Sequence, residues 1–328
     1  MIETREIGSV GQVSLTVLVD NKANLIVESS DTVKYFTDQP LLAEHGFSVL
    51  IQLDNSDERI LWDAGVSKIA LMENLRRMKL DFHAISKIAL SHGHMDHFAA
   101  LTTLLNEMNL QPEAKDWGGT ITPEELEDWM AGYQIPVVSH PAAFRERWAR
   151  KEDGTLVGPF LPPPELEWKA AGAKMIYSKK PYRLAPGCWT TGFVPRTSFE
   201  KSGRPAKLFY REGSNFLPDG LEEDQAVVIH VKDKGLIVLS GCAHSGIVNT
   251  VRYAKEFSGI DAVYAIIGGF HLARAKDEEI SQTIDYLKKV NPIYLIPSHC
   301  TGFRAESQIA QAMPEAFIEG VVGATYNF

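Results

Sequence analysis

The stretch SHGHMDH, residues 91–97, brings three histidines and one aspartate into seven positions. It directly follows the short apolar run ISKIAL at 85–90, which is bounded and enriched in Ile and Leu as buried strands are. The residues after it, 98–108, carry apolar side chains at helical spacing. The sequence therefore predicts that the histidines lie on a turn between a strand and a helix.

Such a turn is typical of a metal site. Burying these polar groups without partners would cost several kcal/mol each, whereas neutral imidazole and carboxylate suit zinc, iron or manganese. His92 and His94 can point to one side of the turn while Asp96 and His97 reach a second point. One turn can thus supply ligands to two ions about 3.5 to 4 Å apart, the separation of dinuclear catalytic sites.

The same pattern recurs farther along the chain. Strands are predicted at 13–19, 47–53, 59–62, 85–90, 226–231, 236–239, 262–267 and 293–296, and helices at 67–79, 98–108, 246–257 and 277–289. Each of the last three strands leads into a histidine, in order His244, His271 and His299. These strand ends could supply the ligands that the first turn lacks.

Four other histidines carry less information. We interpret His83, His140 and His230 as ordinary core or surface residues, because a lone histidine is rarely a ligand. His45 precedes Gly46 and a predicted strand, and we leave both interpretations open for it.

Composition limits the partners and the compartment. The chain has 328 residues, 45% of them hydrophobic, and a net charge of -9 without any concentration of Lys and Arg, which argues against nucleic-acid binding. No apolar run reaches the roughly 18 residues of a membrane span, and the first residues do not resemble a signal peptide. Three cysteines, an odd number, lie far apart in the chain, which argues against a disulfide framework: Cys188, Cys242 and Cys300. We expect a cytoplasmic protein.

The segment at about 111–195 differs in amino-acid composition from the rest of the chain. It contains five tryptophans and the proline-rich run GPFLPPP at 158–164, which ends regular structure. We expect an insert that forms a cap near the site. Its tryptophans either belong to the core or line a pocket for a flat or apolar substrate.

These motifs resemble a known family. SHGHMDH matches the HxHxDH signature of the metallo-β-lactamase superfamily, and LWDAG at 61–65 is similar to its first motif. Further stretches look like one branch, the relatives of dihydropterin-ribofuranosylaminobenzene 5'-phosphate synthase: VDN at 19–21, LSGCAHSGIVNT at 239–250, GGFHL at 268–272 and PSHCTG at 297–302. The resemblance covers nearly the whole chain.

The resemblance implies one α/β domain over 1–328, an αββα sandwich of two mixed sheets with outer helices and an inserted cap. By the family pattern His92 and His94 serve a first ion. The second ion is assigned to Asp96, His97 and His299. Asp63 would support the metal turn from behind.

The chain departs from the family pattern at two points. The stretch TTGFVPRTSFE at 190–200 stands where most members have a ligand histidine, and Cys242 stands where they have a bridging aspartate. We therefore expect His244 to be the third ligand of the first ion. Without a bridging carboxylate, the second ion would be weakly bound, exchangeable or absent. Cys242 is either a thiolate ligand or a small apolar residue that packs behind the metals, and Cys300 is interpreted as structural.

An anion site is a further hypothesis. The SGCAHSG turn precedes a predicted helix, so the backbone N–H groups of Ser245 and Gly246 could receive a phosphate or similar group. A plain N-cap by Ser245 is an equal alternative. Arg196 and Lys201 either supply counter-charges or face solvent.

These residues lead to a functional hypothesis: a metal-dependent hydrolase in which metal-bound hydroxide attacks an ester, phosphoester or lactone. Asp96 would orient the water, and His271 would bind an anionic group or donate a proton. We expect one or two zinc ions, with manganese or iron as alternatives, a small anionic substrate, and a chain compatible with a homo-oligomer. A transferase of the synthase type, releasing diphosphate, is the first alternative. A non-hydrolytic metal-binding or redox protein is the second.

Overall fold

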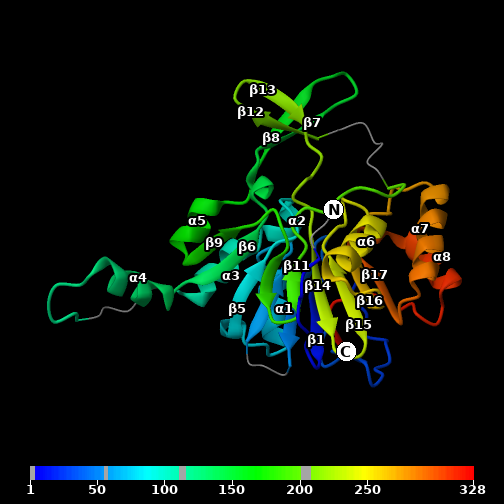
Figure 1. The fold of residues 1–328 in the computed structure, drawn as a ribbon, viewed down its shortest axis with the longest axis horizontal. Helices are drawn as coiled ribbons and strands as arrows, with labels where there is room; N and C mark the ends of the chain where they lie inside the picture. The colour runs from blue at the N-terminus through cyan, green and yellow to red at the C-terminus, as the bar shows by residue number, and fades with distance from the viewer. Residues whose placement is uncertain (1–3, 55–57, 111–115, 201–207) are drawn as a thin grey trace.

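The computed structural model describes residues 4–54, 58–110, 116–200 and 208–328 (Figure 1). Lys201, one of the two predicted counter-charges, lies outside these residues. Within them the strands form sheets of eight, six and four strands. Two of these sheets are the main layers of the molecule.

The eight-stranded sheet carries the first part of the chain and one strand from its end. Its order is β2 (Val33–Tyr35), β18 (Ala324–Asn327), β1 (Val13–Val19), β3 (Ser48–Leu53), β4 (Arg59–Trp62), β5 (Ile85–Ala89), β6 (Ile135–Ser139), β9 (Ala173–Tyr177). Neighbours from β2 to β4 are antiparallel, and those from β4 to β9 are parallel. The sheet is therefore mixed, as expected.

The six-stranded sheet is mixed as well. Its order is β10 (Tyr182–Ala185), β11 (Cys188–Thr190), β14 (Ala226–Val231), β15 (Gly235–Ser240), β16 (Val263–Gly269), β17 (Tyr294–Ser298). The last two pairs, β15 with β16 and β16 with β17, are parallel. Parallel strands end at the same edge of a sheet, so the residues that follow these three strands come together there.

Helices cover the outer faces of both main sheets (Figure 1). The eight-stranded sheet is covered by α1 (Ala70–Arg77), α3 (Leu101–Met108) and α5 (Glu165–Ala170), with the short α2 (Met95–Phe98) at its edge. The six-stranded sheet is covered by α6 (Ile247–Ser258), α7 (Asp277–Val290) and α8 (Phe303–Ala312). Single turns of 3-10 helix lie at η1 (Phe82–Ala84), η2 (Pro141–Phe144) and η3 (His299–Thr301).

Successive residues of one strand serve different cores. Val17 packs between the two sheets while its neighbour Leu18 packs under the helices, and Leu239 and Val238 divide in the same way. A strand whose two faces are both buried needs apolar residues at every position. This explains the continuous apolar runs in the sequence, and the predicted αββα sandwich is confirmed.

The third sheet stands apart from the two layers, at the top of the view in Figure 1. It joins two distant segments, with the strand order β13 (Asn215–Pro218), β12 (Leu208–Glu212), β7 (Arg147–Arg150), β8 (Leu156–Phe160). The segment at about 111–195 is therefore not one insert, because its strands β6, β9, β10 and β11 complete the main sheets. Its tryptophans and prolines obscured short buried runs such as IPVVS at 135–139.

Two features lie outside the layers. Helix α4 (Pro123–Ala131) projects from the body and has no buried residue (Figure 1). No helix in the described ranges is both long enough and apolar enough to cross a membrane.

Candidate metal centre

The site lies where strands of both main sheets end. Asp63 follows β4 and His92 follows β5, whereas His244, His271 and His299 follow β15, β16 and β17. Within each sheet these strands run parallel, so their carboxyl ends share one edge. Chain segments far apart in sequence therefore meet at this edge.

The predicted ligands form two groups around one thiol. The ligand atoms of His92, His244 and Cys242 lie within 4.8 Å of one another. The ring centroid of His94 lies 4.6 Å from that of His92 and 4.8 Å from that of His244. The six residues predicted to hold metal thus lie together, because the second group combines three of them with the same thiol: Asp96, His97, His299 and Cys242.

Asp63 and Ser91 set the tautomer of His92. The Ser91 hydroxyl donates to Asp63 Oδ2 at 2.6 Å, and its oxygen lies 2.8 Å from His92 Nδ1. A hydroxyl has one proton, so an oxygen that donates to Asp63 accepts from His92 Nδ1–H. His92 Nε2 therefore carries a lone pair.

The same logic applies to His97 and His299. His97 Nδ1 lies 2.7 Å from Asp63 Oδ2, which can only accept. His299 Nδ1 lies 3.1 Å from Asn21 Oδ1, and the amide nitrogen of Asn21 donates to the His299 carbonyl. In the neutral form, both rings therefore carry the proton on Nδ1 and a lone pair on Nε2.

These lone pairs point at neighbouring imidazole nitrogens. The Nε2 atoms of His97 and His299 lie 3.2 Å apart, as do those of His92 and His244. In the first pair both nitrogens are acceptors, which repel at this distance unless a cation, either a proton or a metal ion, lies between or beside them. In the second pair His92 Nε2 is an acceptor, and it faces either a proton on His244 Nε2 or a shared cation. The donor set of imidazoles, one carboxylate and one thiol fits zinc or a similar transition metal, with Nδ1 bonded outward as metal-binding histidines require.

Burial and neighbouring charges give the histidines of the site different pKa values. Burial lowers the pKa of His92 and His244 well below the usual range and that of His94 to about 4. Burial also acts to lower the pKa of His97, but the carboxylates of Asp63 and Asp96 outweigh it and raise the value to about 9. Three of these imidazoles are thus held neutral and ready to bind metal.

Cys242 lies between the two groups. Its sulfur is 3.2 Å from His97 Nε2, and burial raises the pKa of its thiol. Gly241 permits this position, because a Cβ there would lie 2.2 Å from Ser91 Oγ. The donor atoms of Cys242, His271 and Cys300 also lie within 4.8 Å of one another, and the His271 ring is 4.3 Å from His244. Cys300 is therefore part of the immediate surroundings of the site.

The predicted anion-binding groups are already occupied. The Ser245 N–H donates to Asp224 Oδ2 at 2.7 Å, and the Gly246 N–H donates to the Ala243 carbonyl at 2.9 Å. In the first turn of α6, Glu200 accepts from two further backbone N–H groups. The hypothesis of an anion at this helix end is therefore corrected, since folding delivers two carboxylates to it. Arg196 donates to the Leu221 carbonyl at 3.2 Å.

Of the other histidines, one borders the site and three have partners elsewhere in the fold. His45 is exposed, but its Nε2 lies 3.4 Å from Asp96 Oδ2, so it borders the site. The rest are engaged elsewhere: His230 with the Gly8 carbonyl, His140 with the Ala142 N–H, and His83 beside Asp81.

Several residues of the site were not predicted. Asp20 and Asn21 follow β1, where Asp20 Oδ1 accepts from the His299 N–H at 2.9 Å and Asn21 orients the ring. The VDN motif was the available signal for both. Arg147 and Asp224 had no signal, because each is a single charged residue whose partners lie far away in sequence.

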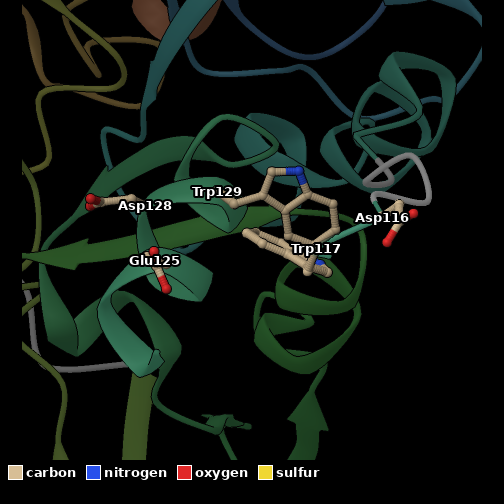
Figure 2. A pocket seen from close by; sticks show the side chains of 5 residues that line it. All are labelled: Asp116, Trp117, Glu125, Asp128 and Trp129. Atoms are coloured by element: carbon tan, nitrogen blue, oxygen red, sulfur yellow. The ribbon is translucent and has the colours of Figure 1, made fainter. Parts of the chain in front are cut away.

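The tryptophans do not line the metal centre. Trp117 and Trp129 pack edge to face with ring centroids 5.3 Å apart, in a cavity of about 400 Å³ beside α4 (Figure 2). Its other lining residues are the acidic Asp116, Glu125 and Asp128. Trp168 is fully buried under the eight-stranded sheet. The cavity lies on the projecting segment, away from α2 (Figure 1).

The comparisons with known proteins agree with this geometry. Residues 42–299 match the Metallo-beta-lactamase superfamily, so the chain belongs to this superfamily. It is similar to 7,8-dihydropterin-6-methyl-4-(beta-D-ribofuranosyl)-aminobenzene-5'-phosphate synthase of Methanocaldococcus jannaschii, with 31% identity over 301 residues, 88% of this chain and 94% of the relative. An uncharacterized protein of the same organism is 30% identical over 299 residues, covering 91% of this chain and 97% of its own.

A solved structure shows the same fold. Tm1679, described as a metal-dependent hydrolase of the beta-lactamase superfamily, has a TM-score of 0.66 and 20% identity, covering 95% of this chain and 98% of its own. The family match and the relative of 31% identity confirm the predicted family, and the chain is an enzyme.

Proposed function

We propose that this chain is a metal-dependent hydrolase acting on a small anionic ester, phosphoester or lactone. One observation carries the proposal: two pairs of imidazole Nε2 atoms, His92 with His244 and His97 with His299, face each other at 3.2 Å. Hydrogen bonds at Nδ1 turn the Nε2 atoms of His92, His97 and His299 inward, so that these nitrogens are prepared for a cation. No closed cysteine-rich shell surrounds them among the described residues, as a structural zinc site would require.

The two groups would hold one ion each. His92, His94 and His244 would bind the first, and Asp96, His97 and His299 the second, with Cys242 between them. Zinc is the ion we propose, with manganese or iron as alternatives. Ions at these positions would make a water more acidic and stabilise negative charge on the attacked group.

The chain's own residues would orient the ligand imidazoles, bind the water and donate a proton to the leaving group. Asp63 and Ser91 hold the Nδ1 protons of His97 and His92, which keeps both Nε2 lone pairs inward. The carboxylate of Asp96 is 19% exposed and lies 3.4 Å from His299 Nε2, so it can accept a hydrogen bond from a water on the open side. His271 would donate a proton to the leaving oxygen. Arg196 would attract an anionic substrate.

The relative from M. jannaschii favours a second candidate, a transferase of the synthase type that releases diphosphate. Its similarity extends over 88% of this chain. Both reactions need metal ligands that face an anionic group, so the same site serves either. Product analysis separates them.

The test combines metal and product analysis. Elemental analysis of the purified protein should find zinc or another transition metal, and metal-loaded protein should hydrolyse a member of a panel of phosphodiesters, phosphotriesters, lactones and sulfate esters. Release of diphosphate only after addition of a pterin diphosphate and an aromatic amine would favour the transferase. The His94→Ala variant is the control for contaminating activity. A protein that binds no transition metal would refute both.

A further inference from the structure

A buried arginine of the small sheet lies directly behind the metal turn. Arg147, the first residue of β7, is 4% exposed, and its Nε donates to Asp219 Oδ2 at 2.7 Å. Its terminal nitrogens donate to Glu223 and to the carbonyls of Ala142 and Ala143. The guanidinium fork is therefore fully committed in fixed directions.

Gly93 rests against this arrangement. A Cβ at Gly93, between the two ligand histidines of the turn, would lie 2.1 Å from the Ala143 carbonyl oxygen and 2.9 Å from an Arg147 nitrogen. The glycine thus permits close approach of the metal turn to the segment that Arg147 holds. Displacing the guanidinium would remove a surface against which Gly93, the residue between His92 and His94, is placed.

The acidic partners of Arg147 lie on a loop that reaches both histidine turns. The loop 219–225 follows β13 of the small sheet and leads into β14. Its Asp224 accepts from the Ser245 N–H at 2.7 Å, next to His244. Its Gln225 N–H donates to the Ser91 carbonyl at 3.1 Å, and the Gln225 side chain donates to the Leu90 carbonyl at 2.7 Å.

We propose that Arg147 is a positioning residue for the metal centre and that, with the loop 219–225, it couples the small four-stranded sheet to the turns of His92, His94 and His244. The inference rests on the proposed metal site and extends it to residues outside the ligand set. A displacement of the small sheet would be transmitted through Arg147 and the loop to the first ion position. The small sheet thereby becomes part of the site.

Stability alone does not explain this arrangement. Removing a guanidinium and two carboxylates from water is expensive, and apolar residues of similar volume often stabilise a fold as well or better. The directional bonds to two carbonyls next to Gly93 instead indicate a geometric requirement. Arg150, in the same strand, shows the contrast: it is exposed and lies over the ring of Phe209, 3.9 Å from its centroid.

The experiment measures Co²⁺ binding to metal-free, full-length protein, without any substrate. The variants are Arg147→Met, Arg147→Lys, which keeps the charge but loses the fork, and Asp219→Asn, which keeps the shape of the acceptor. Arg150→Met is the matched control in the same strand. Circular dichroism establishes that each protein is folded. We expect Co²⁺ affinity to fall about 10-fold in Arg147→Lys, as when residues supporting metal ligands are replaced, and to be unchanged in Arg150→Met.

The possible outcomes separate a failure of the role of Arg147 from a failure of the proposed metal site. Unchanged affinity in folded Arg147→Lys and Asp219→Asn would overturn the inference while the metal centre stands. Unfolding of all three variants would show a residue needed for folding and would also overturn the positioning role. A wild-type protein that binds no Co²⁺ would refute the proposed function and this inference together.

Discussion

The Nε2 atoms of His97 and His299 lie 3.2 Å apart, although 202 positions separate the two residues in the chain. Both rings are fixed by an acceptor at Nδ1, Asp63 in one case and Asn21 in the other. The fold therefore holds two lone pairs in contact, an arrangement that only a cation makes favourable. The fold thereby brings distant strand ends together at this point.

Replacing Asp63 by Asn should weaken metal binding. The amide would offer a donor where His97 Nδ1–H and the Ser91 hydroxyl need an acceptor, which favours the tautomer with the proton on Nε2. We expect a loss of about 10- to 100-fold in zinc affinity, measured by competition with a chelator. The exposed Asp81→Asn serves as control. Equal affinity in the two variants would show that Asp63 does not set the tautomer.

Metal binding should depend on pH differently at the two positions. The pKa of His97 is raised to about 9 by Asp63 and Asp96 in spite of burial, so below that pH a proton occupies the place of the second ion. Affinity there should fall about tenfold for each pH unit below 9, since one proton is displaced. The pKa of His94 is lowered to about 4 by burial, so the first position should keep its affinity until the pH approaches that value.

Calorimetry in buffers of different ionisation enthalpy measures this difference. Near neutral pH and in the Cys242→Ala protein, where no thiol proton adds to the balance, the second ion should release one proton and the first ion none. The same shift stabilises the metal-free fold below the ordinary histidine pKa of 6.5, and this contribution should be lost as the pH rises through about 9. Equal proton release at both positions would contradict the assignment.

The central strands could be predicted because both of their faces are buried. In β1, Val17 and Leu18 serve different cores, so the end of the strand, Val17–Val19, is continuously apolar. Short strands gave no such signal: β2 has three residues, and β6 contains a proline. Their assignment depends on neighbours far away in sequence, which local periodicity does not reveal.

The ligand histidines could be predicted because their pattern is local. The residues that hydrogen-bond to the ligand turns could not be predicted. Histidines crowded into one turn, or repeated after successive strands, are recognisable locally. Asp224 is not, although it accepts from the Ser245 N–H that we expected to bind an anion. A backbone N–H can bind a ligand only if no other part of the folded chain accepts its hydrogen bond, and the local sequence does not reveal this.

Replacing His94 by Ala should abolish metal content at the first position and turnover together. His94 is only half-buried and its side chain caps no helix, so the fold should persist. Elemental analysis and activity on the same preparation measure both effects, with the exposed His83→Ala as control. Full activity in a metal-depleted His94→Ala protein would exclude the proposed mechanism.

Replacing Cys242 by Ala distinguishes its two interpretations. If the thiolate is a ligand, the second position should lose about 10-fold in affinity for Cd²⁺, and the thiolate-to-cadmium charge-transfer absorption should disappear. The geometry favours this result, because the sulfur lies 3.2 Å from His97 Nε2 and in both ligand groups. If Cys242 only fills space, Cd²⁺ binding should stay the same and stability alone should fall by about 1 kcal/mol through the small cavity. Cys188→Ala, a buried thiol in β11, provides the matched control for that loss of packing.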